Sequence, residues 1–173
     1  MRQLADPLPA APRATIDSAS GTATATVDVA CPPERVYRML VTAETERWWG
    51  APGIYRMEEW SADLRVGGTW RVLVCMAEGP RFPASGEFLE FDPPGRIVQT
   101  RRYHFDHPTL GRRDTVVTYA LAPRGTGTQL TVVHQGFGRL EQAAFEHAAG
   151  WERMLGWLQA YSQLVRDEEE GWR

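Results

Sequence analysis

The 173-residue chain contains no lysine, so all nineteen of its basic residues are arginines. A lysine amine is needed to form a Schiff base with a carbonyl substrate and to complete a Walker-type phosphate loop. The composition therefore excludes both kinds of site, together with a lysine general base.

Cysteine is also scarce, since only Cys31 and Cys75 are present. Two thiols this far apart in sequence form neither a disulfide framework nor a zinc knuckle. We expect both to be small buried side chains in a reducing compartment, which predicts a cytoplasmic protein. No metal and no cofactor are expected.

Long apolar runs are missing as well. No segment approaches the length that crosses a bilayer, and the Pro- and Ala-rich start lacks the basic and apolar regions of a signal peptide. The net charge of -3 gives no field that would attract a phosphate backbone. We expect neither a membrane nor nucleic acid as a partner, and a homodimer is left open.

What is present is a regular alternation of strands and turns. Residues 22–31 alternate small apolar and polar side chains, which predicts a half-buried strand. Pro32-Pro33-Glu34 then predicts the start of a helix, and residues 43–49 a second short one. Turn residues separate six further predicted strands, at residues 55–60, 69–76, 83–91, 96–105, 115–121 and 126–135.

The chain closes with a long predicted helix over residues 141–167, whose wide apolar face includes Trp151, Leu155 and Leu158. Such a face needs a concave partner, and only a strongly curved antiparallel sheet is large enough. The sequence thus predicts an α+β fold in which a sheet grips a helix. We expect a flexible tail over residues 1–21, one domain over residues 22–168, and a short tail over residues 169–173.

Trp48-Trp49 and the Gly67-Gly68 turn before Trp70 suggest a shaped cavity, because large rings lie close to missing side chains. Adjacent residues at the end of a helix point apart, so one of the two indoles either faces a ligand or only plugs the end of the core. Trp70 is expected either to pack in the core or to form a wall of the cavity.

Polar candidates are few. His134 shares a predicted strand face with apolar residues and is either a satisfied core histidine or an acid or base. Arg101 and Arg102 point to opposite faces of one strand, so one of them could project inward and bind an anion or an enolate. The sequence does not decide which, because a one-residue slip reverses the faces. His104-Phe105-Asp106-His107 is interpreted as a surface loop rather than a metal site, since no fourth ligand accompanies it.

Several motifs, in the same order along the chain, give a resemblance to a known family. The chain resembles the START-like, or Bet v 1-like (SRPBCC), superfamily, and within it bacterial proteins similar to the C-terminal domain of the activator of the heat shock protein 90 ATPase. The motifs are residues 31–37, Trp48-Trp49, residues 63–71, Gly86-Glu87-Phe88, residues 93–98, residues 127–134 and residues 147–151. The resemblance implies a helix-grip fold with seven strands, two short helices after the first strand, and a cavity between sheet and helix.

Family membership alone does not imply a reaction. The leading hypothesis is a non-enzymatic domain that binds a small apolar or amphipathic molecule, and no catalytic residue is assigned. An enzyme similar to polyketide cyclases or dehydratases is the second hypothesis, and it requires Arg101 or Arg102 to converge with Tyr103 or His134. A protein-interaction or co-chaperone-like module is the third, and its sign would be an exposed Trp48 or Trp172. The predicted ligand-binding residues are Trp49, Tyr55, Trp70, Tyr103, His134, Trp151 and Leu155.

Overall fold

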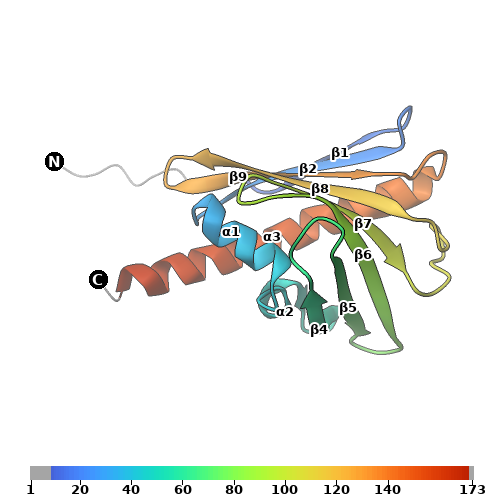
Figure 1. Cartoon of the computed structure of the whole chain (residues 1–173), viewed down its shortest axis with the longest axis horizontal. Coiled ribbons are helices and arrows are strands. Elements are labelled where there is room, and N and C mark those ends of the chain that lie inside the picture. The colour runs from blue at the N-terminus through green and yellow to red at the C-terminus, as the bar shows by residue number, and fades with distance from the viewer. Residues whose placement is uncertain (1–8, 172–173) are drawn as a thin grey trace.

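The computed structural model describes residues 9–171 (Figure 1). In these residues nine strands form one sheet, and three helices form the layer that covers it. The strands are antiparallel and lie in the order β1-β2-β9-β8-β7-β6-β5-β4-β3. The elements in chain order are β1 (Arg13–Asp17), β2 (Thr22–Val29), α1 (Pro33–Val41), α2 (Thr45–Trp48), β3 (Gly50–Ala51), β4 (Tyr55–Ala62), β5 (Thr69–Met76), β6 (Arg81–Asp92), β7 (Arg96–Tyr103), β8 (Thr115–Arg124), β9 (Gly127–Gln135) and α3 (Glu141–Gly171).

All seven predicted strands and all three predicted helices are present, but two strands were not predicted. Residues 13–17 do not belong to a flexible tail, because β1 pairs along the edge of β2. The Glu152 side chain on α3 accepts the Ala14 N–H at 2.7 Å, which ties β1 to the helix as well. The rest of the predicted tail, residues 1–8, lies outside the described residues. The other additional strand, β3, is a two-residue pairing with β4.

The helix α3 also runs further than predicted. Residues 169–171 continue it rather than forming a tail, and Arg166 and Glu170 form an ion pair one turn apart at 2.9 Å. Its apolar face is buried as expected, with Trp151, Leu155 and Leu158 in the core. None of the helices in residues 9–171 combines the length and the apolar character that crossing a bilayer requires.

The sheet bends, and this bend positions the site. Figure 1 shows β5 and β6 running at a steep angle to β2 and β9, with α3 lying across the concave side. The helix packs closely on β1 and β2, whereas no comparably close approach joins it to β4, β5 or β6. Large side chains fill part of the space between α3 and strands β4, β5 and β6, and the rest of that space is a cavity. Cys31 and Cys75 are both free and buried, as predicted.

Candidate functional site

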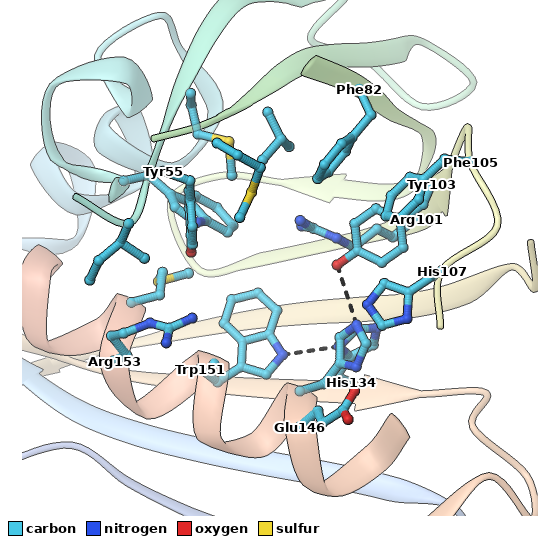
Figure 2. Close-up of a pocket in the computed structure, with 18 residues that line it drawn as sticks. Tyr55, Phe82, Arg101, Tyr103, Phe105, His107, His134, Glu146, Trp151 and Arg153 are labelled. Carbon is cyan, nitrogen blue, oxygen red and sulfur yellow. Dashed lines mark hydrogen bonds between the residues drawn. The ribbon is translucent and has the colours of Figure 1, made fainter. Parts of the chain in front are cut away.

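A cavity of about 430 Å³ lies between the bent part of the sheet and α3 (Figure 2). Strands β4, β5 and β6 contribute Met57, Val74 and Phe82 to one wall, and α3 contributes Trp151 and Met154 to the other. Sites for small molecules have volumes of roughly 300–1,000 Å³ and mostly apolar walls with a few polar groups. The cavity has the size and lining of such a site.

Five of the seven predicted binding residues line this cavity, namely Trp49, Tyr55, Tyr103, His134 and Trp151. The other two, Trp70 and Leu155, do not. Leu155 is fully buried in the hydrophobic core. Trp70 lies deeper, where its ring stacks on Trp60 and its indole N–H donates to the Thr100 carbonyl at 3.2 Å.

The indoles of Trp48 and Trp49 do not point apart, so that prediction is wrong. Their rings stack at 5.4 Å between centroids, because the backbone changes from helical to extended at Trp49 (φ -87°, ψ 93°). Trp48 is buried and donates its N–H to the Met39 carbonyl at 2.9 Å. Trp49 faces the cavity and donates to the Tyr55 hydroxyl at 3.3 Å. The pair therefore joins the core to the cavity wall.

Arg101 is a buried charged residue of the cavity wall and is only 7% exposed. Its guanidinium carbon lies 5.4 Å from the Trp49 ring, 5.7 Å from the Trp70 ring and 5.4 Å from the Tyr103 ring. Its Nε atom is buried without a hydrogen-bond partner in the described structure. Burial disfavours the charge, but Tyr103, Tyr119 and Tyr55 outweigh it and raise the pKa of Arg101. The guanidinium is therefore a buried cation held among aromatic rings.

The structure settles which of the two neighbouring arginines faces inward. Arg102 points to the outer face of β7, where its guanidinium binds the Asp114 carboxylate at 2.7 Å. Among residues 9–171, no carboxylate forms an ion pair with Arg101. Because alternate residues of a strand share a face, Tyr103 enters the cavity beside Arg101.

His134 is a satisfied core histidine. The Trp151 indole can only donate, so its 3.0 Å bond makes Nδ1 of His134 an acceptor and leaves the ring proton on Nε2. That proton is donated to the Thr115 hydroxyl at 2.8 Å, and the hydroxyl donates to the Arg101 carbonyl at 3.3 Å. Burial, with His147 and Arg101 nearby, holds the pKa of His134 well below its usual range. Both nitrogens are occupied, which leaves His134 no free lone pair for acid or base work.

A second histidine, His147 on α3, contacts the tyrosine of the cavity. Its Nδ1–H donates to the Ala143 carbonyl at 2.7 Å, so Nε2 accepts from the Tyr103 hydroxyl at 3.3 Å (Figure 2). Burial, together with the nearby Arg101 and His107, lowers the pKa of His147 to about 4, although the hydrogen bond to Ala143 and the Glu146 carboxylate oppose the shift. His147 is therefore neutral at pH 7 and adds no second positive charge beside Arg101.

His107 and Glu146 complete this end of the cavity. Nδ1 of His107 accepts the Leu110 N–H at 3.2 Å, and burial lowers the pKa of His107 despite the nearby Glu146 carboxylate. The carboxylate of Glu146 accepts bonds from Thr109 at 2.6 Å and from Gln142 at 3.0 Å, which lower its pKa. Glu146 is thus bound to neutral partners outside the cavity.

The two histidines of the loop at residues 104–107 lie in different surroundings. His104 lies 2.6 Å from the Ser85 hydroxyl, whereas His107 faces the cavity. Across residues 9–171, no cluster of three or more histidine, cysteine or carboxylate side chains could hold a metal ion.

A comparison with known protein families shows which family the chain belongs to. The family model described as "Activator of Hsp90 ATPase homolog 1-like protein" matches residues 30–163. The chain belongs to this family. The match spans the fold from the end of β2 into α3, including every residue of the cavity discussed above. No curated protein matches the chain.

Solved structures of similar proteins support the fold of this Hsp90 ATPase activator homolog-like domain. Protein CV1439 from Chromobacterium violaceum is 29% identical, with coverage of 82% of this chain and 96% of that chain and a TM-score of 0.67. Protein NE0264 from Nitrosomonas europaea is 26% identical, with coverage of 90% and 99% and a TM-score of 0.66. The AHSA1 protein from Silicibacter pomeroyi, at 23% identity, coverage of 83% and 99% and a TM-score of 0.69, shows the shared fold alone.

Proposed function

We propose that this domain binds a small amphipathic molecule in the cavity between the sheet and α3. The observation that carries the proposal is a cavity of about 430 Å³ with mainly aromatic and apolar walls, which would stabilise an apolar ligand by removing its surface from water. Ile54 and Met76, 36% and 38% exposed, also line the cavity and form an apolar approach to it. Two free, buried thiols support a cytoplasmic location.

Gly150 offers a direct test, because it lines the cavity from α3 and a Cβ atom placed there would meet no atom within 4 Å. We expect Gly150→Phe to weaken binding of the neutral dye N-phenyl-1-naphthylamine by at least about tenfold, since the new ring fills the ligand's space. The variant should fold, because phenylalanine is a better helix former than glycine and a Cβ atom at this position meets no neighbouring atom. Dye fluorescence and thermal unfolding measure the two effects.

Ala149→Phe is the matched control, since Ala149 is the neighbouring residue and is exposed. It places the same ring outside the cavity and should leave dye affinity unchanged. Unaltered dye binding in a folded Gly150→Phe protein would contradict the proposal.

A second candidate function is an enzyme that stabilises an enolate, and one observation favours it. Arg101 and Tyr103 enter the same cavity, as the cyclase-like hypothesis requires, while His134 is already occupied. The guanidinium and the phenol would stabilise the negative oxygen of an enolate whose α-proton passes to solvent water. Deuterium exchange beside the carbonyl of 2-tetralone, followed by NMR, tests this reading, and exchange no faster than with Tyr103→Phe would count against it.

The interaction hypothesis has less support. Trp48 is buried, so it cannot form the exposed aromatic surface that the hypothesis requires. Trp172 lies outside the described residues.

A further inference from the structure

We infer that the ligand of the cavity carries one negatively charged oxygen group, and that this group binds inside the cavity at Arg101. The inference rests on the proposed function and specifies its substrate class: an aromatic or aliphatic monoanion, such as a carboxylate, with an apolar body.

The positive charge of Arg101 has no counter-charge in an ion pair within residues 9–171. A buried ion without a partner costs several kcal/mol in proteins, so buried charges are normally paired. Arg101 is 7% exposed and forms no ion pair with any carboxylate in residues 9–171. Glu146, which also lines the cavity, accepts its bonds from Thr109 and Gln142 instead. An anionic ligand would supply the missing counter-charge.

The surroundings of the Arg101 guanidinium are aromatic rings rather than hydrogen-bond acceptors for Nε. Three rings lie within 6 Å of its central carbon, and such cation–π contacts recover part of the lost hydration without using the N–H donors. Nε still lacks an acceptor. A guanidinium is a planar fork of five donors that suits a planar carboxylate. The rings hold the cation in place and Tyr103 also forms a hydrogen bond with it, whereas Nε remains available to an oxygen ligand.

Arg101 and Arg153 occupy different parts of the cavity, Arg101 inside it and Arg153 at its mouth. Arg153 is a second cation lining the cavity, but it is exposed and lies over the rings of Tyr55 and Trp157, at 5.9 and 5.7 Å. Charge pairing in contact with water contributes little to affinity. In Figure 2 Arg101 reaches into the cavity from β7, whereas Arg153 rises from α3 on another side. The buried arginine is thus the group able to select an anion.

Two dyes with the same ring system test the inference. 8-Anilinonaphthalene-1-sulfonate carries one negative charge, and N-phenyl-1-naphthylamine is its neutral counterpart. We expect Arg101→Met to weaken binding of the charged dye at least about tenfold more than binding of the neutral dye, because hydrogen bonds to charged groups carry that much energy. Arg102→Met removes a cation from the outer face of the same strand and should change neither affinity.

The outcomes distinguish the two proposals. If neither dye binds the parent protein, the proposed function fails. If both dyes bind and Arg101→Met weakens them equally, the anion site is wrong while the binding function stands. Loss of the charged dye with Arg153→Met instead of Arg101→Met would also overturn the inference, because the charge would then lie at the mouth.

Arg101→Met should fold, since the change removes the cost of burying a charge that has no ion-pair partner and leaves no carboxylate unpaired. If it does not fold, the parent protein still gives an answer. At pH 7.5, 2-naphthoate should displace the neutral dye at a concentration at least about tenfold lower than 2-naphthylmethanol does. Equal displacement by the two would contradict the inference.

Discussion

Gly86→Ala is expected to lower the free energy of unfolding by about 3 kcal/mol or more, because the new methyl group has no space. A Cβ atom at Gly86 would lie 1.8 Å from the Thr100 carbonyl oxygen and 2.5 Å from Nε1 of Trp70. Neither atom yields easily, since one belongs to the backbone of β7 and the other donates a hydrogen bond to it. A midpoint of thermal unfolding lower by about 10 °C would be the measured result for a domain of this size.

The clash also bears on the site. The pairing of β6 with β7 is interrupted between Ser85 and Phe88. At this interruption the Trp70 indole N–H donates a hydrogen bond to the Thr100 carbonyl. Gly86 thus lets Trp70 reach across β6 and lie beneath the Arg101 guanidinium. Gly95→Ala is the matched control, because a Cβ atom at Gly95 meets nothing within 4 Å. A stability loss of the same size at Gly95, or none at Gly86, would contradict this explanation.

Acid should destabilise the domain through its buried histidines. Burial lowers the pKa of His147 from 6.5 to about 4, so between these values the unfolded chain binds a proton that the folded chain does not. The contribution of neutral His147 to the free energy of unfolding is therefore fully present above about pH 6.5, and it is lost as the pH falls toward 4. One histidine shifted this far contributes about 2–3 kcal/mol between pH 7.5 and pH 4.5. His134, whose pKa is also lowered, adds to the effect in the same direction.

His147→Gln tests that assignment, because glutamine is polar at this position and does not titrate. Urea unfolding at pH 7.5 and 4.5 should show the parent losing about 2 kcal/mol more than the variant. The groups that act on His147 are Arg101, His107 and His134, which oppose its protonation, and Glu146, which favours it. An equal loss in parent and variant would show that other groups, such as the paired carboxylates, cause the acid sensitivity.

The fold was largely predictable from the sequence, because a period of two describes the strands and a wide apolar face describes α3. The short strands β1 and β3, at the two edges of the sheet, were not predictable. Arg13–Asp17 follows a Pro- and Ala-rich stretch, and its pairing depends on the open edge of β2 and on Glu152, 138 residues after Ala14. The choice between Arg101 and Arg102 was likewise undecidable, because it depends on the register of β7 against its neighbours.

The polar end of the cavity was the main omission. His107 comes from a loop that the sequence suggests is exposed, and Glu146 and His147 precede the recognised apolar face of α3. One signal was available: His147 lies four residues before Trp151, so the two share a helix face. Trp70 lies in the core, which was one of the two alternatives for it, because an inward strand position does not reveal whether a ring lines a cavity or lies one layer beneath it.

The most direct measurement of the central claim is a crystal structure of the protein with bound 8-anilinonaphthalene-1-sulfonate. The expected result is dye between Trp151 and the bent sheet, with a sulfonate oxygen within hydrogen-bonding distance of the Arg101 guanidinium. Dye found only on the outer surface, or in the cavity with its sulfonate at Arg153, would contradict the account.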